Sequence, residues 1–162
     1  LYDCALACLA EEFDIGHASI LMLEAGGERL RTVASMGYAR SGVGSEIPLG
    51  EGVVGVAARE RTPIRIGHAT SEYAYGRAIR EAAGGAPCAE IPPPGLADAR
   101  SQIAVPIEAF GELVGVLFAD SPLDLRFGYD DEDALVALAG HLGAAIRVLT
   151  ARSSASAPRP RR

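Results

Sequence analysis

The sequence contains no lysine: all 15 of its basic side chains are arginine, set against 21 acidic ones. Four of the arginines lie in the last eleven residues: Arg152, Arg159, Arg161 and Arg162. The rest of the chain therefore carries 11 positive and 21 negative side chains, a net charge of about −10. Because a body this acidic repels phosphate backbones, we expect no nucleic-acid binding by the folded part.

Cysteine is scarce and follows no disulfide or metal-binding pattern. The three cysteines, Cys4, Cys8 and Cys88, make an odd number with no recurring spacing, which is typical of reduced thiols in the cytoplasm. The absence of C-x-x-C, H-E-x-x-H and G-x-S-x-G argues against structural zinc, zinc-protease and serine-hydrolase chemistry. No apolar run approaches the roughly 20 residues of a membrane span, so we expect no membrane partner.

The hydrophobic pattern predicts an α+β fold with a helix at each end of the chain. Helices are expected at 1–13, 53–61, 72–83 and about 130–152. Strands are expected as two runs within 18–35, and at 62–66, 101–109 and 112–120, with residues 37–49 and most of 67–99 irregular. We assign residues 1–152 to one domain and 153–162, SSASAPRPRR, to a flexible linker. The linker predicts an output domain in the same polypeptide.

The hexapeptide GEGVVG at 50–55 matches G-x-G-x-x-G, the glycine pattern that cradles a pyrophosphate in dinucleotide-binding folds. The preceding residues, SEIPL, are too short for the buried strand that this fingerprint needs, and Pro48 cannot donate to a central ladder. We therefore interpret the glycines as architecture. Gly50 and Gly52 allow a sharp turn, and Gly55 lets a short helix lie close to the sheet.

Three separated blocks, GEGVVGVAARERTPIRI, SQIAVPIEAFGELVGVLFAD and FGYDDEDALVALAGHLGAAIR, resemble the GAF domain family in order and spacing. The resemblance covers residues 1 to about 150. It implies a central antiparallel sheet with the N- and C-terminal helices on one face and a helix and loop region on the other. It also implies a sensory or dimerisation module. Because no metal-ligand spacing and no nucleophile–base pair is visible in the sequence, we expect the chain not to be an enzyme.

The resemblance places a ligand pocket between the sheet and residues 67–99. The candidate ligand-binding side chains are His68, Tyr73, Tyr75, Arg77, Arg80, Glu90 and Arg100. Arginine suits an anionic ligand through bidentate hydrogen bonds, and tyrosine suits a flat ring through stacking. The alternative interpretation is that these are solvated loop side chains.

The motifs name no cofactor. Cyclic-nucleotide-binding relatives carry an N-K pair followed by F-x-x-x-D-E. Here residues 127–132 supply the second half, and Ala119 and Asp120 replace the pair. Cys88 lies where bilin-binding relatives attach a chromophore, but no histidine is next to it. His68 is the histidine best placed to ligate haem.

One enzymatic branch of the GAF family reduces free methionine sulfoxide with a cysteine beside the pocket. Cys4 and Cys8 lie far along the chain from Cys88, and we interpret both as buried thiols that act as small hydrophobic side chains. Two alternatives to a ligand-binding regulator stay open. One is a redox enzyme of this type that uses Cys88 and a partner thiol, and the other is a structural dimerisation module without a ligand.

The terminal helices predict a parallel homodimer. A helix that covers one core shows one apolar stripe, but the first helix shows two: Leu1, Cys4, Ala5 and Cys8; and Tyr2, Leu6, Leu9 and Phe13. The last helix has a nearly heptad stripe: Leu135, Leu138, Leu142, Ile146 and Leu149. We expect Gly140, Gly143 and Ala144 to allow close approach. The alternative is a monomer in which both helices only cover the sheet.

Overall fold

The computed structural model describes residues 1–69, 91 and 93–155. The elements follow in the order α1 (Tyr2–Phe13), β1 (Ala18–Leu23), β2 (Arg29–Met36), β3 (Glu46–Pro48), α2 (Gly52–Glu60), β4 (Ile64–Ile66), β5 (Ser101–Ala109), β6 (Glu112–Ser121) and α4 (Tyr129–Ala155). The last helix thus runs three residues beyond the expected end at Arg152. The helix expected at 72–83 lies outside the described residues.

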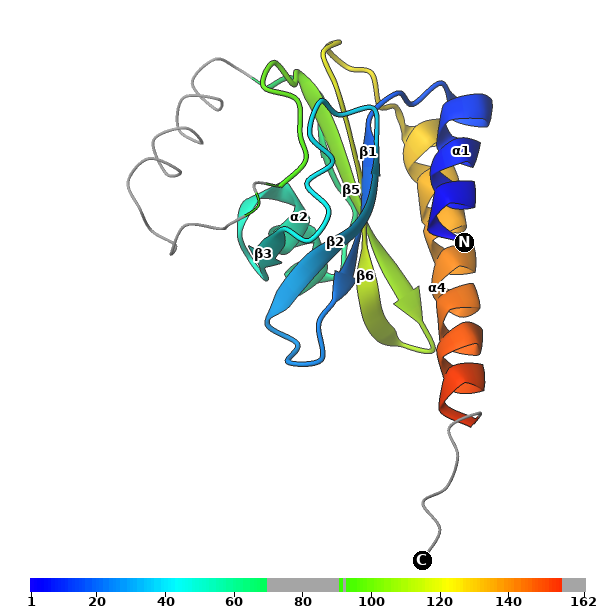
Figure 1. The fold of residues 1–162 in the computed structure, drawn as a ribbon. Helices are drawn as coiled ribbons and strands as arrows, with labels where there is room; N and C mark the ends of the chain where they lie inside the picture. Colours follow the sequence, from blue (N-terminus) through cyan, green and yellow to red (C-terminus); the bar gives the residue numbers. More distant parts are fainter. Residues whose placement is uncertain (70–90, 92, 156–162) are drawn as a thin grey trace, which may run out of the picture.

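The strands form one six-stranded sheet in the order β3-β2-β1-β6-β5-β4, and every neighbouring pair is antiparallel (Figure 1). The hairpins β1–β2 and β5–β6 pair through β1 and β6 to form the centre. At the second turn, Phe110 and Gly111 both have positive φ, 54° and 82°. This conformation matches the twist of the strands that it joins. The predicted α+β class and antiparallel sheet are confirmed.

The terminal helices α1 and α4 lie side by side against one face of the sheet (Figure 1), as expected. Large side chains of both helices and the strands bury each other there: Leu6, Leu9, Ile20, Ile103, Ile107, Leu117, Leu135 and Leu142. A Cβ at Gly143 would lie 2.3 Å from the Glu108 carbonyl oxygen, whereas one at Gly140 would meet nothing within 4 Å. Of these two glycines, only Gly143 is needed for close approach of the helix to the sheet.

Helix α2 covers the other face over a smaller apolar cluster. The buried members of this cluster are Leu21, Leu30, Val54, Ala57, Ala58, Ala104, Val116 and Phe118. Gly50 and Gly52 have φ of 88° and 62°, and a Cβ at Gly55 would lie 2.3 Å from the Pro48 carbonyl oxygen. The glycines of GEGVVG therefore turn the chain and seat α2, which confirms the architectural interpretation.

Strand β3 lies in the region that we expected to be irregular. It pairs antiparallel with β2 at the edge of the sheet, with Glu46 opposite Arg31. The two side chains form an ion pair of 2.5 Å. An edge strand can include Pro48 because the strand bonds on one side only. Its three residues are too few for an alternating pattern to reveal it.

Strand β5 is buried on both faces. In the sequence, Ile103, Val105 and Ile107 alternate with Gln102 and Ala104, a pattern typical of a strand with one buried face. In the structure, Gln102 and Ala104 are nevertheless 5% and 0% exposed. The second face is buried because the sheet is covered on both sides. The apolar alternation of β5 therefore identifies the buried face on the α4 side correctly. It does not reveal that the opposite face, on the α2 side, is buried as well.

The terminal helices keep exposed apolar surface. In α1 the stripe of Leu6 and Leu9 is buried, whereas Leu1 and Cys4 are exposed and Cys8 is half-buried. The interpretation of Cys4 as a buried thiol is therefore wrong, because Cys4 lies on the side of α1 away from its own core. In α4 the predicted stripe is buried at Leu135, Leu142 and Ile146 and partly buried at Leu138, but Leu149 is 49% exposed.

By length and composition alone, α4 could cross a membrane. Its span Tyr129–Arg152 has an 18-residue window of mean hydropathy 1.6, of which 28% is buried in this structure. The expectation that no stretch approaches membrane length was therefore too strict. The buried face of α4 packs on the sheet as the core helix of a globular domain does, so this finding is weak evidence for a membrane span.

Candidate functional site

Polar side chains replace apolar ones at one end of the face that α2 covers. Gln102 of β5 pairs with Asp120 of β6, and Ser19 of β1 pairs with Phe118 of β6. Because directly opposed residues of antiparallel strands share a face, these side chains lie on the same side as Phe118 and the α2 cluster. Ser19, Gln102 and Asp120 are 0%, 5% and 1% exposed. We call these three side chains the polar end.

Asp120 joins three segments that are distant in the sequence. Its Oδ1 accepts a hydrogen bond of 3.0 Å from the hydroxyl of Tyr38, a residue that follows β2 in the sequence. Its Oδ2 accepts a hydrogen bond of 2.9 Å from the backbone amide of Leu96. Burial, and then the charge and hydrogen bond of Asp120, raise the pKa of Tyr38 above its ordinary value. The carboxylate therefore holds both the chain after β2 and residues 95–96 against the sheet.

The Ser19 hydroxyl oxygen is fully buried and has no hydrogen-bond partner among the described residues. Buried hydroxyl groups are nearly always paired, and leaving one unpaired costs about 1–3 kcal/mol. On the same face, the hydroxyls of Thr32 and Ser45 pair with each other at 2.9 Å. Ser19 is thus a position at which a ligand or water could supply a missing partner.

Two of the seven candidate ligand-binding residues, His68 and Arg100, lie within the described residues, and they meet at an acid that was not predicted. The His68 Nδ1 lies 2.8 Å from Asp124 Oδ1. Arg100 donates from Nε and Nη2 to both oxygens of the same carboxylate, at 3.0 and 2.7 Å. The hydrogen bond from Arg100 is the largest cause that lowers the pKa of Asp124. Asp124 therefore competes with any anionic ligand for the Arg100 guanidinium.

The other predicted side chains of this region lie outside the described residues: Tyr73, Tyr75, Arg77, Arg80, Cys88 and Glu90. Their roles stay predictions, as do an anion at Arg100 and haem ligation by His68. Within residues 1–69, 91 and 93–155, no three histidine, cysteine or acidic side chains gather as a metal site would require.

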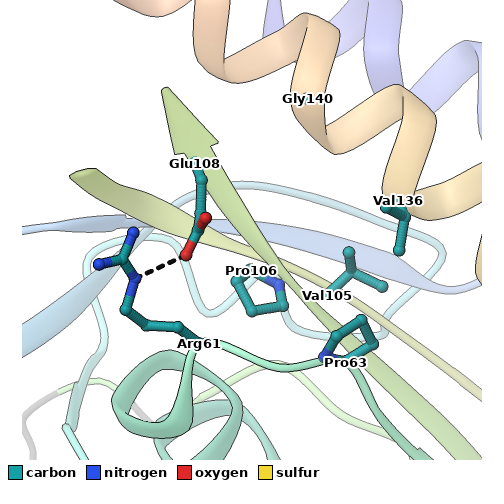
Figure 2. Close-up of a pocket in the computed structure, with 7 residues that line it drawn as sticks. All are labelled: Arg61, Pro63, Val105, Pro106, Glu108, Val136 and Gly140. Carbon is teal, nitrogen blue, oxygen red and sulfur yellow. Dashed lines mark hydrogen bonds and ion pairs between the residues drawn. The ribbon is translucent and has the colours of Figure 1, made fainter. Parts of the chain in front are cut away.

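A cavity of about 200 Å³ lies elsewhere, at the open edge of β5. Figure 2 shows its lining, which comes from the α2–β4 connection, β5 and α4: Arg61, Pro63, Val105, Pro106, Glu108, Val136 and Gly140. Arg61 donates to Glu108 at 2.6 Å and to the Gly111 carbonyl oxygen at 2.5 Å, beside a proline that offers no amide. The cavity is smaller than most ligand pockets, which measure about 300–1,000 Å³. Pro106 and the ion pair protect the strand edge.

The F-x-x-x-D-E sequence builds the start of α4. Phe127 is buried, and Asp131 Oδ2 accepts a hydrogen bond of 2.7 Å from the Gly128 amide. Glu132 forms an ion pair of 3.2 Å with Arg65 of β4. These contacts anchor and cap a helix N-terminus, where acids are favoured. The three matching residues thus have structural roles that do not require a nucleotide.

The sequence motifs did not identify the polar end. Asp120 entered only as a replacement for a lysine, and no binding-site motif included Ser19 or Gln102. The usable signal was Asp120 itself, a carboxylate at the end of VGVLFAD, a run too apolar for a surface strand.

An antiparallel sheet with terminal helices on one face and a covered, partly polar second face defines the class of the fold, a two-faced α+β domain. The family model described as the GAF domain matches residues 5–147. The protein therefore belongs to the GAF family. No curated protein matches the sequence.

Solved GAF-fold structures agree with this assignment. The GAF domain of a Coxiella burnetii phosphoenolpyruvate-protein phosphotransferase has a TM-score of 0.72 at 22% identity, covering 94% of this chain and 84% of that one. The corresponding domain from Acinetobacter has a TM-score of 0.66 at 22% identity, covering 93% and 80%. The substrate complex of a Neisseria meningitidis free methionine-R-sulfoxide reductase has a TM-score of 0.65 at 25% identity, covering 88% and 73%. Both regulatory domains and enzymes are thus similar to this chain.

Proposed function

We propose that this GAF domain is a non-enzymatic, cytoplasmic regulatory module. It binds a small molecule on the α2 side of the sheet, forms a homodimer through α1 and α4, and relays its state to an output domain of the same polypeptide. The observation that carries the ligand-binding part is the polar end. Above all it is the buried Ser19 hydroxyl, which has no partner among the described residues and lies on the same face of the sheet as Gln102 and Asp120.

The polar end has the mixed character of a small-molecule site. Phe118 and Ala104 supply apolar surface next to the buried polar groups, and such sites combine apolar walls with a few placed hydrogen-bonding groups. Asp120 already holds the chain on either side through Tyr38 and Leu96. A ligand that pairs with Ser19 would therefore meet a surface that is arranged before it arrives.

The positions of two thiols support a non-enzymatic role. Cys4 and Cys8 belong to α1, which packs on the face of the sheet opposite to the polar end. They therefore offer no nucleophile to a ligand that lies on the α2 side. Cys88 is outside the described residues, and its chemistry is decided by the experiment below.

Exposed apolar side chains on the terminal helices support the dimer. Four apolar side chains are more than 40% exposed: Leu1, which is the N-cap of α1, and Val136, Val148 and Leu149 of α4. Exposed apolar side chains of this kind can be buried by association with a second copy of the domain. The helices run along the same face (Figure 1), so two copies could bury both helices together.

Native mass spectrometry of the protein as purified tests both parts. We expect a dimer of twice the 16.8 kDa chain mass that retains a small molecule, released on denaturation. The double variant Val148→Asp and Leu149→Asp should be monomeric. Val43→Asp, a change at a similarly exposed valine outside the helices, should stay dimeric. A wild-type monomer would contradict the dimer. The absence of any bound or added small-molecule partner would contradict ligand binding.

A second candidate function is reduction of free methionine sulfoxide. The structural likeness to the Neisseria meningitidis reductase in complex with its substrate favours it. The test is an activity assay with free methionine-R-sulfoxide and a thiol reductant, on the wild type and Cys88→Ser. Turnover that Cys88→Ser abolishes would replace the regulatory proposal with the enzymatic one. No turnover above the buffer rate would favour the regulator.

A further inference from the structure

Residues 122–128 connect β6 to α4, and we call them the junction loop (Figure 1, yellow). Nearly every residue of this loop bonds to a different part of the fold. Toward the α2 side, the Leu123 carbonyl oxygen accepts a hydrogen bond of 2.8 Å from the Ser101 hydroxyl. The Leu125 amide donates to the Gly67 carbonyl oxygen at 2.7 Å. Between them, Asp124 binds His68 and Arg100.

These contacts bring together the two described ends of the chain between β4 and β5, residues 67–69 and 100–101. The Ala69 amide donates to the Arg100 carbonyl oxygen at 2.7 Å, and the Arg100 amide donates to the Ser121 carbonyl oxygen at 2.8 Å. The Asp124 carboxylate then binds a side chain from each end. Any change in the separation of these ends would therefore move Asp124.

The other half of the junction loop bonds to both terminal helices. The Arg126 Nη2 donates to the carbonyl oxygens of Phe13 and Asp14, at 2.6 and 3.2 Å, where α1 ends. Arg65 of β4 donates to the Phe127 carbonyl oxygen at 3.0 Å, and its guanidinium carbon lies 4.1 Å from the centre of the Tyr129 ring in the first turn of α4. The loop thus joins the end of α1 to the beginning of α4.

The backbone of the junction loop is held in an unfavourable conformation. Leu125 has φ of 54° although its side chain is 75% exposed and makes little use of packing. A leucine rarely adopts this left-handed region unless its surroundings impose it. The bonds of the flanking residues therefore hold the loop in one arrangement, and loosening one side should release the other.

We propose that the junction loop couples the ends of the 67–101 segment to the adjoining ends of α1 and α4, with Asp124 and Arg126 as its two attachment points. The regulatory meaning of this coupling rests on the proposed function, but the coupling itself requires no ligand. A molecule that displaced residues 67–69 or 100–101 would act on Asp124, and the loop would carry the displacement to the helices.

Amide hydrogen exchange of the ligand-free 162-residue chain tests the coupling. Asp124→Asn should accelerate exchange by about threefold to fivefold at Ile15, whose amide bonds to Leu9, and at Glu132, whose amide bonds to Gly128. Asp124 bonds to neither residue. The matched control is Glu46→Gln, which removes another exposed carboxylate that pairs with an arginine, and it should leave both amides unchanged.

The reverse experiment uses Arg126→Gln. Because coupling between two sites is reciprocal, this variant should accelerate exchange at Ala69 and Leu125 by a similar factor. In the double variant, the two effects should combine to less than their product, because both disrupt one loop. Changes confined to the residues that each altered side chain touches, or effects that multiply independently, would overturn the proposal.

The outcome is separable from the fate of the proposed function. Long-range acceleration in a protein that binds no small molecule would establish the coupling and contradict ligand binding. Local changes alone, in a protein that does bind one, would overturn the coupling and leave the binding in place.

Discussion

The two faces of the sheet are built differently. The α1 and α4 face is filled by large apolar side chains and by backbone contact at Gly143, whereas the α2 face has a smaller apolar cluster beside Asp120. Asp120 is the only buried charged side chain within the part of the chain that the structure describes. Apolar packing is non-directional, while a buried carboxylate requires particular partners. The first face therefore supplies stability, and the second has directional groups suited to recognition.

The largest expected effect is on the face of the sheet that α1 and α4 cover. Gly143→Ala should destabilise the fold by about 3 kcal/mol, because the added Cβ overlaps the Glu108 backbone. Its matched control, Gly140→Ala, adds the same methyl group to the same helix in open space and should stabilise it by about 1 kcal/mol. Chemical denaturation measures both. Equal effects of the two variants would show that α4 does not pack on β5 as described.

On the α2 face, Asp120→Asn should cost about 2 kcal/mol, because an amide cannot accept hydrogen bonds from both Tyr38 and Leu96 as the carboxylate does. Asp98→Asn, the same change at an exposed acid of the nearby segment, should be neutral. The measurement is again chemical denaturation. If Asp120→Asn leaves the free energy of unfolding unchanged, the hydrogen bonds of Asp120 do not stabilise the α2 face.

Alkaline pH should weaken the hydrogen bond between Tyr38 and Asp120. The pKa of Tyr38 is raised above the ordinary value of 10.0, first by burial and then by Asp120. A raised folded-state pKa contributes stability below the unfolded-state pKa and loses it as pH rises. Stability should therefore be constant up to about pH 10 and then fall by up to about 1.4 kcal/mol per pH unit.

Tyr38→Phe should lose most of this alkaline slope. Burial also raises the pKa of Tyr2, so a residual slope remains. Denaturation at pH 9 and pH 11 measures the difference between the wild type and the variant. An unchanged slope in Tyr38→Phe would show that its hydroxyl is not held by Asp120.

The smallest effect concerns the outer side of α1. Cys4 is exposed and Cys8 half-buried, so a thiol reagent should label Cys4 first, by about tenfold in rate. Mass spectrometry of peptides after short labelling times measures the order. Labelling of Cys8 before Cys4 would restore the original interpretation of Cys4 as a core residue.

The sequence predicted the helix face better than the α2 face. The positions of Leu135, Leu142 and Ile103 follow a helical or an alternating period, which a packed apolar face imposes on the chain. The hairpin turns have an equally local signal, because Gly26 and Gly27 separate β1 from β2 and Gly111 lies between β5 and β6. These features are local, so each could be inferred from a short window.

The polar end and the junction loop could not be inferred in this way. Tyr38 and Asp120 are 82 residues apart, and Arg126 bonds to Phe13 across 113 residues. No periodic pattern encodes a contact of this kind. The candidates His68 and Arg100 lie together in the structure, but Asp124, the acid that both contact, had no motif to mark it.

The most direct test of the central claim is chemical-shift mapping of backbone amides while small polar metabolites are added. The account predicts that a binding metabolite shifts the amides of Ser19, Gln102 and Asp120, and that Asp120→Asn weakens the effect. Shifts confined to the β5-edge cavity around Arg61 and Gly140, or no shift with any metabolite, would contradict it.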